Sequence, residues 1–128
     1  MGINLNYNHL FKTPLMPNQP IPVPQADAMV ASYVSYMQKH GINMTQQTMN
    51  VSFTTPELMA WLDQVKVFTD EFRICVGVYP DGETKAGRIT AIIWPYKGGK
   101  PATWPADEGK GGGGSSFIPP FNEGGLQP

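Results

Sequence analysis

Cysteine and charge are both scarce in this chain, and each scarcity excludes a class of protein. A single cysteine among 128 residues, Cys75, excludes an internal disulfide and a multi-cysteine zinc site. Its place inside a strand pattern favours a small buried hydrophobic residue over a reactive thiol. Charged residues make up 15%, and nine basic against ten acidic residues leave a net charge of -1. Because the basic residues are scattered singly, without the clusters that drive counterion release, we expect no nucleic-acid partner.

Long apolar runs and targeting signals are missing as well. No stretch reaches the ~20 apolar residues of a membrane-spanning helix. The first residues, MGINLNYNHLFKTPLMP, lack the basic region followed by an apolar region that marks a secretory signal. We therefore expect a soluble cytoplasmic protein without a membrane partner.

Motifs for catalysis and cofactor binding are also missing. Neither histidine, His9 or His40, stands near a serine or cysteine in a triad context, and His40 fits better as a partner of a helix C-terminus. Asp81 and Glu83 lack the further oxygen ligands of a calcium loop. The run GKGGGGSS over 109–116 departs from the phosphate-binding consensus and precedes no helix. We expect no catalytic residue, no metal and no cofactor.

Glycine and proline are abundant, with 14 and 13 residues, and they concentrate at the two ends of the chain. This predicts a Pro-rich N-terminal arm over 1–23, a core domain over 24–96, and a Gly/Pro-rich C-terminal arm over 97–128. An ordered arm needs docked side chains, because fixing each residue costs ~1–2 kcal/mol while burying an aromatic ring returns ~1.5–3 kcal/mol. We expect the C-terminal arm to dock on the core or on a partner, with Trp104, Phe117 and Phe121 as its anchors.

Two helices are predicted in the core. The first begins at Pro24 and ends before Gly41, which suits the left-handed residue that follows a helix. Its apolar stripe consists of Ala26, Met29, Val30, Tyr33, Val34 and Met37. A short strand over 49–54 follows, and then a second helix that ends near Lys66 is predicted, either with a capping box from Thr54 to Glu57 or with Thr55 as cap and Pro56 at the first helical position. The buried face of that helix is expected to hold Leu58, Trp61, Leu62 and Val65.

The stretch EFRICVGVYPDGETKAGRITAIIWPY, residues 71–96, predicts a β-hairpin with strands over 72–79 and 88–94. Pro95 is expected to stop the second strand or to place it at an edge. Both faces of the hairpin are apolar, so both need cover. We predict an α+β fold in which about three strands form one small antiparallel or mixed sheet packed by two helices. The stripe of the first helix would contact the face formed by Phe72, Ile74, Val76 and Val78.

The hairpin resembles a segment found in short uncharacterised bacterial proteins of Bacteroidota type. The pattern is Arg-Ile-x-x-Gly-x-Tyr followed by Gly-Arg-x-Thr and a closing proline. The matching positions are Arg73, Ile74, Gly77, Tyr79, Gly87, Arg88, Thr90 and Pro95, and the ending FNEGGLQP is similar at Asn122, Gly124 and Pro128. Many of these relatives end in cysteine-containing tails, which this chain lacks. The resemblance implies the architecture but no established activity.

Arg73 and Arg88 leave two interpretations open. They either bind a carboxylate of Glu71, Glu83 or Glu123 or a backbone carbonyl of the docked arm, or they grip an anionic ligand. We expect a non-enzymatic protein-binding or assembly module whose partner is a second copy or another protein. The alternative is a small-ligand or catalytic domain that uses Arg73, Tyr79 and Arg88 around an anionic group. A small effector or immunity-type protein is a third possibility.

Overall fold

The structure, a computed structural model, describes residues 18–106, 116–122 and 125–127. The chain divides into two units, Met1–Tyr36 and Met37–Pro128, and each is described by itself. Some of the predictions lie outside the described residues. These are the first 17 residues of the N-terminal arm with His9, most of the Gly-rich run, and the positions Glu123, Gly124 and Pro128.

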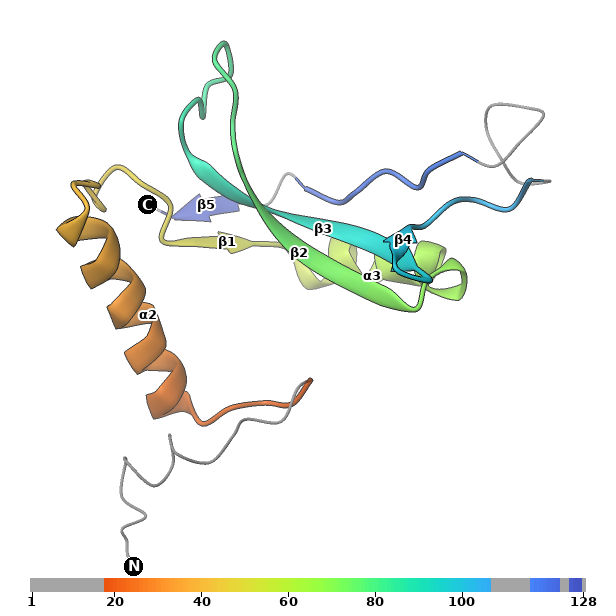
Figure 1. Cartoon of the computed structure of the whole chain (residues 1–128), viewed down its shortest axis with the longest axis horizontal. Coiled ribbons are helices and arrows are strands. Elements are labelled where there is room, and N and C mark those ends of the chain that lie inside the picture. The colour runs from red at the N-terminus through yellow and green to blue at the C-terminus, as the bar shows by residue number, and fades with distance from the viewer. Residues whose placement is uncertain (1–17, 107–115, 123–124, 128) are drawn as a thin grey trace, which may run out of the picture. The chain divides into compact units, whose positions relative to one another are not determined.

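Helix α2, Val23–Lys39, confirms the first predicted helix (Figure 1). Its C-terminal end is closed as the sequence indicates. Gly41 has a φ of 84°, its N–H donates to the Gln38 carbonyl at 3.0 Å, and the Ile42 N–H donates to the Met37 carbonyl at 2.9 Å. This pair of bonds is a Schellman motif, which needs a left-handed residue where Gly41 stands. The predicted apolar stripe is only partly covered, because Met29 and Val30 are about half exposed.

Helix α3, Thr55–Val65, confirms the second predicted helix and continues as a 3-10 turn, η1, over Lys66–Phe68. Thr54 is its N-cap, but the Thr54 hydroxyl donates to the Glu57 carboxylate at 2.7 Å and makes no bond with the helix backbone. Of the two predicted caps, Thr54 is therefore the one formed and Thr55 is not, and the reciprocal backbone bonds of a capping box are absent at this helix start. Within the described residues, no helix is long and apolar enough to cross a membrane.

The predicted hairpin is formed by β2, Glu71–Val78, and β3, Ile89–Lys97. They pair antiparallel without a bulge, from Glu71 opposite Tyr96 to Val78 opposite Ile89. A two-residue strand β4, Lys100–Pro101, pairs with the far side of β3 and completes a three-stranded antiparallel sheet. The α+β fold class with two helices and about three strands is confirmed.

Pro95 behaves differently from the prediction. Strand β3 runs through it to Lys97 and is paired on both sides at that point. Pro95 is tolerated because only its carbonyl is used on the far side, where it accepts the Ala102 N–H at 2.9 Å. The missing proline N–H therefore leaves no partner unsatisfied.

The predicted strand over 49–54 is also placed differently. Strand β1, Asn50–Ser52, does not join the hairpin but pairs antiparallel with β5, Gly125–Gln127, in a separate two-stranded sheet. The partner of β1 comes from the C-terminal arm. The alternation of residues 49–54 indicates a strand but not its partner. That partner lies in a Gly-rich segment whose sequence has no strand periodicity, so the pairing could not be predicted.

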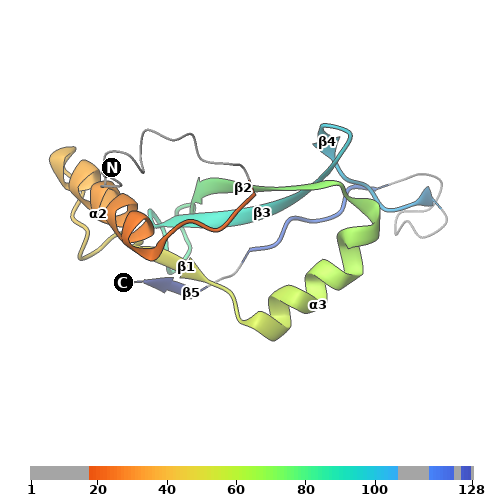
Figure 2. The ribbon, with the colours of Figure 1, turned by 90° about the horizontal axis from the view of Figure 1, so that it is seen from below.

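The hydrophobic core of the second unit lies where α3 packs on the hairpin (Figure 2). Its fully buried members are Val65, Ala102 and Ile118, and the partly buried residues packed against them are Trp61, Phe68, Phe72 and Trp104. The Trp61 ring lies 5.7 Å from the Phe72 ring. The core is thus built from α3, the start of β2 and the C-terminal arm.

The predicted core face of β2 is wrong in three of its four positions. Phe72 is packed in the core, but Ile74, Val76 and Val78 are 71%, 75% and 62% exposed. The physical reason is the short length of α3, whose packed residues reach Phe72 at the start of the strand. The remainder of this face is left uncovered.

Candidate functional site

The two predicted arginines do not converge on one site. Arg73 lies opposite Trp94, whereas Arg88 directly precedes Ile89, the partner of Val78 at the other end of the hairpin. At a rise of 3.2–3.4 Å per residue, the two positions are about 20 Å apart along the strand direction. A single anionic group cannot bridge that distance. The paired arrangement that the anion interpretation requires is therefore not formed.

Arg73 is engaged by its own neighbours. Its guanidinium donates to the Glu71 carboxylate at 3.1 Å and lies 4.0 Å from the centre of the Tyr96 ring. The hydrogen bond with Glu71 raises the pKa of Arg73 above its ordinary value. Glu71 lies on the same strand as Arg73, whereas Tyr96 belongs to β3. The exposed Arg73 side chain is therefore already engaged by an ion pair along β2 and by a ring of the neighbouring strand.

Tyr79 lies at the loop end of the hairpin, where it contacts the C-terminal arm. Its hydroxyl is 3.2 Å from the Asn122 side-chain oxygen, and Lys85 lies 5.5 Å over its ring. The Asn122 amide nitrogen donates to the Ala91 carbonyl at 2.6 Å and to the Thr90 hydroxyl at 3.1 Å. Asn122 thus fastens the arm to β3 beside Tyr79. Arg88, half-buried, accepts the Tyr79 N–H at its carbonyl.

The C-terminal arm docks along the far side of β3. Phe121 exchanges two backbone hydrogen bonds of 2.9 Å with Ile93, and the Ile118 N–H donates to the Ala102 carbonyl at 3.0 Å. The Phe121 ring stacks on Trp61 at 4.8 Å, and the Trp104 ring meets Phe68 edge-on at 5.7 Å. These bonds fix which side chains of the arm point into the core.

Phe117 does not anchor the arm on its own chain. Its side chain is 69% exposed, whereas Ile118 is 1% exposed and lies in the core. Neighbouring residues of an extended segment point to opposite sides, so the arm buries one of the two and exposes the other. Sequence reasoning missed Ile118 because it ranked anchors by aromatic size. The PP pair that follows Ile118 could have suggested extended backbone there.

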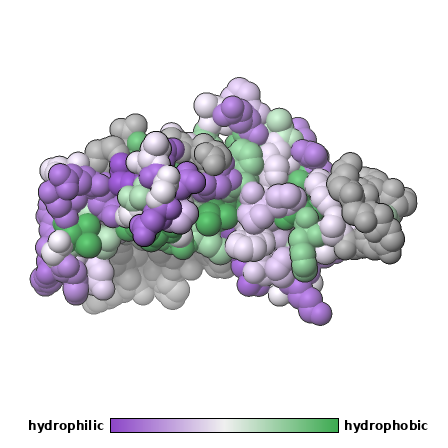
Figure 3. All heavy atoms as spheres, turned by 90° about the horizontal axis from the view of Figure 1, so that it is seen from above, coloured by the Kyte–Doolittle hydropathy of each residue, from purple (hydrophilic) through white to green (hydrophobic). Residues whose placement is uncertain are grey.

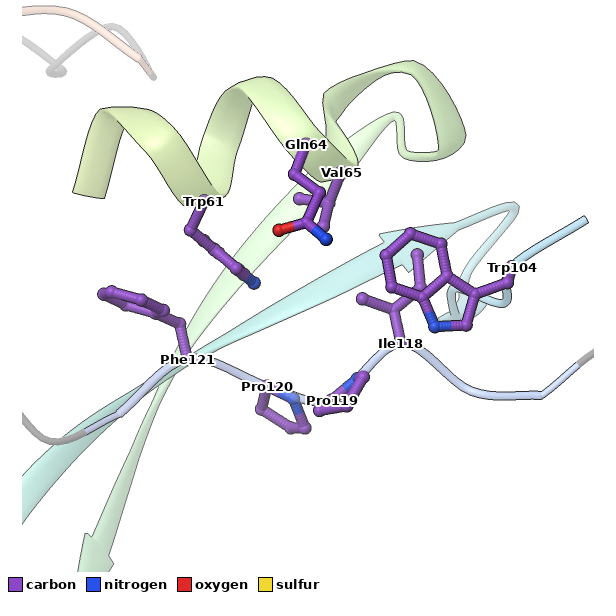
Figure 4. A pocket seen from close by; sticks show the side chains of 8 residues that line it. All are labelled: Trp61, Gln64, Val65, Trp104, Ile118, Pro119, Pro120 and Phe121. Carbon is purple, nitrogen blue, oxygen red and sulfur yellow. The ribbon is translucent and has the colours of Figure 1, made fainter. Parts of the chain in front are cut away.

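A pocket of about 300 Å³ lies between α3 and the docked arm (Figure 4). Trp61, Gln64 and Val65 line it from the helix, Trp104 lines it from the segment after β4, and the remaining lining residues, Ile118, Pro119, Pro120 and Phe121, come from the arm. Its polar groups are the Gln64 amide and the indole N–H groups of Trp61 and Trp104, and no titratable side chain lines it. The pocket can hold an apolar group, but it offers no acid, base or nucleophile.

A second groove, of about 230 Å³, lies on the other side of the arm. Trp94, Pro101 and Phe117 line it together with Ile118, Pro119 and Pro120. The exposed Phe117 ring is part of its wall. The lining is entirely apolar and rigid, but no charged or polar side chain marks a preferred ligand.

The far side of β3 is paired along most of its length, although little of this pairing comes from regular strands. The Gln47 side chain accepts the Ile89 N–H at 2.7 Å, and the Thr48 hydroxyl donates to the Ile89 carbonyl. The Asn122 side chain bonds to the Ala91 carbonyl, and the Phe121 backbone bonds to Ile93. Strand β4 then pairs with the end of β3 at Tyr96 and Lys97. Most of the outward-facing backbone groups on this side therefore have partners.

The outer side of β2 is different. In the described part of the chain, β2 is the end strand of its sheet and pairs only with β3. Residues Phe72, Ile74, Val76 and Val78 direct their backbone N–H and C=O groups outward, because the alternate residues from Glu71 to Gly77 bond to β3. The strand residues from Ile74 to Val78 contain no proline, no charge and no bulge. We call the outer side of Phe72–Val78 the β2 edge.

Exposed hydrophobic side chains accompany these backbone groups. On the face drawn in Figure 3, hydrophobic residues reach the surface between hydrophilic ones. The exposed hydrophobic residues of β2 are Ile74, Val76 and Val78, and they lie on one face of the strand. Cys75, on the other face, is a free half-buried thiol. The β2 edge is the strongest candidate functional site because it offers unpaired backbone and apolar side chains together.

Other chemistries find no site in the described ranges. No group of three or more His, Cys, Asp or Glu side chains is placed there to hold a metal ion. His40 directly follows helix α2 and is exposed. The acidic residues Asp81 and Glu83 are exposed on the hairpin loop.

No family model matches the chain, and no match is found among curated proteins or solved structures. The resemblance of the hairpin to a bacterial family therefore stays a prediction. The functional argument depends on the residues of this chain alone.

Proposed function

We propose that this protein is a non-enzymatic protein-binding or assembly module that acts by strand addition at the β2 edge. The observation that carries the proposal is the exposure of Ile74, Val76 and Val78, at 71%, 75% and 62%, on a strand whose outer side pairs with none of the described strands. An added strand would bond to the outward backbone groups and cover these side chains.

Proteins ordinarily protect such an edge. Lysines, prolines, bulges or covering loops are the usual means, because an open apolar strand is a template for pairing with another chain. Between Ile74 and Val78 the β2 edge has no lysine, proline or bulge, and no strand among the described residues pairs with it. The nearest cation, Arg73, is paired with Glu71 and lies over the Tyr96 ring. The edge is thus suited to binding another strand.

The expected energetics also favour a binding role. Full burial of a valine or isoleucine side chain is worth about 1.5–3 kcal/mol, and the three exposed residues together offer several kcal/mol. Association costs about 4–15 kcal/mol in lost freedom, so backbone hydrogen bonds and side-chain burial are both needed. A moderate, regulated affinity is expected rather than a permanent interface.

No observation favours the alternative of a domain that binds an anionic group. Arg73 and Arg88 lie at opposite ends of the hairpin, and Tyr79 contacts Asn122 of the arm. The pocket beside α3 lacks charged side chains.

A selection from a library of displayed random peptides tests the proposal. The full chain, V76K and V67K serve as targets. Val76 lies in the centre of the β2 edge, and Val67 in η1 is a matched control because it is 70% exposed and carries the same substitution. We expect extended, β-branched peptides to be enriched on wild type and V67K, with at least tenfold weaker binding to V76K. Peptides that bind all three targets equally, or no enrichment at all, would contradict strand addition.

A further inference from the structure

We infer that the strand added at the β2 edge is β2 of a second copy. The two β2 strands pair antiparallel, and the two-fold axis that relates them passes midway between the two Cys75 residues. This inference rests on the proposed function and names its partner. It joins the two three-stranded sheets into one continuous sheet of six strands, in the order β4-β3-β2-β2-β3-β4.

The first argument concerns how many open edges the sheet offers. At the opposite end of the sheet, β4 is only two residues long and consists of Lys100 and Pro101. Short length, lysine and proline all oppose pairing with another chain. The β2 edge is therefore the only unguarded edge among the described strands of this sheet. One unguarded edge on this sheet favours a closed pair, because two-fold pairing of two copies uses the open edge of both sheets at once.

The second argument concerns the register. With Cys75 opposite Cys75, Ile74 pairs with Val76 and Phe72 pairs with Val78, so every outward-facing residue of β2 finds a partner inside the strand. A shift that centres the axis on Ile74 places Val78 opposite Asp70, outside the strand. A shift that centres it on Val76 places Phe72 opposite Pro80, which has no N–H to donate.

The third argument concerns the side chains. In the Cys75 register the exposed Ile74 of each copy lies directly across from Val76 of the other, a β-branched pair of the kind that stabilises sheets. On the other face, Arg73 lies opposite Gly77, which leaves room for its long side chain. No like charges face each other. By contrast, the register that centres on Arg73 would oppose two guanidinium groups.

Disulfide trapping with diamide tests the register in the full-length protein. Residues directly opposite in a non-hydrogen-bonded antiparallel pair have Cα atoms about 4.5 Å apart, which falls within the range for a disulfide. The two Cys75 thiols would lose their hydrogens to diamide, which is reduced to the hydrazine, as the S–S bond forms. The control variants C75S/I74C and C75S/V76C move the single thiol by one residue in either direction.

The geometry predicts a clear ranking. In the proposed register, two thiols at position 74 or at position 76 are offset by two residues, roughly 8–9 Å between Cα atoms, beyond the reach of a disulfide. We expect wild type to form a covalent dimer at least tenfold faster than either control. Random collision predicts the opposite ranking, because Ile74 and Val76 are exposed while Cys75 is half-buried. Faster trapping in either control would overturn the register.

Sedimentation equilibrium of wild type, V76K and V67K under reducing conditions tests the partner itself. We expect wild type and V67K to dimerise with rising concentration and V76K to dissociate at least tenfold more readily. If wild type remains a monomer while peptides still bind in a Val76-dependent manner, self-pairing is wrong and strand addition stands. If neither self-association nor peptide binding depends on Val76, the proposed function fails as well.

Discussion

Replacing Ile118 by alanine should destabilise the protein far more than replacing its aromatic neighbour Phe117. Ile118 is 1% exposed and belongs to the central cluster with Val65 and Ala102. Its truncation removes roughly 2–2.5 kcal/mol of transfer free energy at about 0.8 kcal/mol per buried methylene, and the cavity adds to this. We expect I118A to lower the free energy of unfolding by about 3–4 kcal/mol. Phe117 is 69% exposed, so F117A should cost less than about 1 kcal/mol.

Urea unfolding followed by tryptophan fluorescence measures this difference. With a urea dependence of about 1–3 kcal/mol per molar, I118A should shift the midpoint downward by about 1–4 M, whereas F117A should shift it by less than about 1 M. Both substitutions are best made in the V76K background, so that self-association does not enter the free energy. A cost for F117A equal to or larger than that for I118A would refute the docking of the arm. It would mean that the segment is shifted by one residue, which exchanges the inward and outward side chains.

Three further predictions concern the arm, a helix end and pH. N122A should lower the free energy of unfolding by about 1–3 kcal/mol in the same urea assay, because the Ala91 carbonyl loses its side-chain donor. An unchanged free energy of unfolding would mean that water replaces the bond. G41A should cost about 1–2 kcal/mol, because the φ of 84° at Gly41 disfavours any Cβ, and an unchanged midpoint would contradict the helix end described. Glu71 raises the pKa of Arg73, so the stability from that pair is present below the ordinary arginine range and is lost only as pH rises through the raised value. Wild type and R73Q should therefore show parallel stability profiles between pH 5 and 9 in thermal unfolding, and diverging profiles would contradict this sign.

The elements that could be predicted from the sequence are those whose signals are local. The end of α2 at Gly41, the start of α3 after Thr54, and the hairpin all follow from residues within one turn or one strand. Helix caps and alternating apolar residues act over short distances, so tertiary contacts seldom override them. The fold class followed from these elements together.

Predictions that required knowledge of distant partners failed. Strand β1 pairs with residues 125–127 rather than with the hairpin, and Pro95 is accommodated by Ala102 of the following segment. Alternation identifies which residues share a face, but it does not say which face a short helix covers. For the same reason the exposure of Ile74, Val76 and Val78 could not be foreseen. Their hydrophobicity alone suggested burial, and only the limited reach of α3 leaves them bare.

The place of the candidate site could not be predicted from the sequence. An assembly role was expected, and Arg73 and Arg88 were singled out either as partners of a carboxylate or of the docked arm, or as binders of an anionic ligand. The structure separates them to opposite ends of the hairpin. The site that remains, the β2 edge, carries no polar signature that could distinguish it from a core strand. An open edge is defined by the absence of a neighbouring strand, which is a property of topology rather than of residue type.

The two outer sides of the hairpin differ in how far their backbone groups are paired. The far side of β3 is covered by Gln47, Asn122, Phe121 and β4, segments that are distant in sequence and that each supply a few hydrogen bonds. Irregular arms of this length are costly in conformational entropy, so their use on one side indicates that an open edge there would be harmful. In the described part of the chain the β2 edge is apolar and uncovered, although a single lysine at Val76 would have protected it. This difference between the two edges supports our proposal that the open edge receives a partner strand, and the guarded opposite end would limit the proposed assembly to a pair.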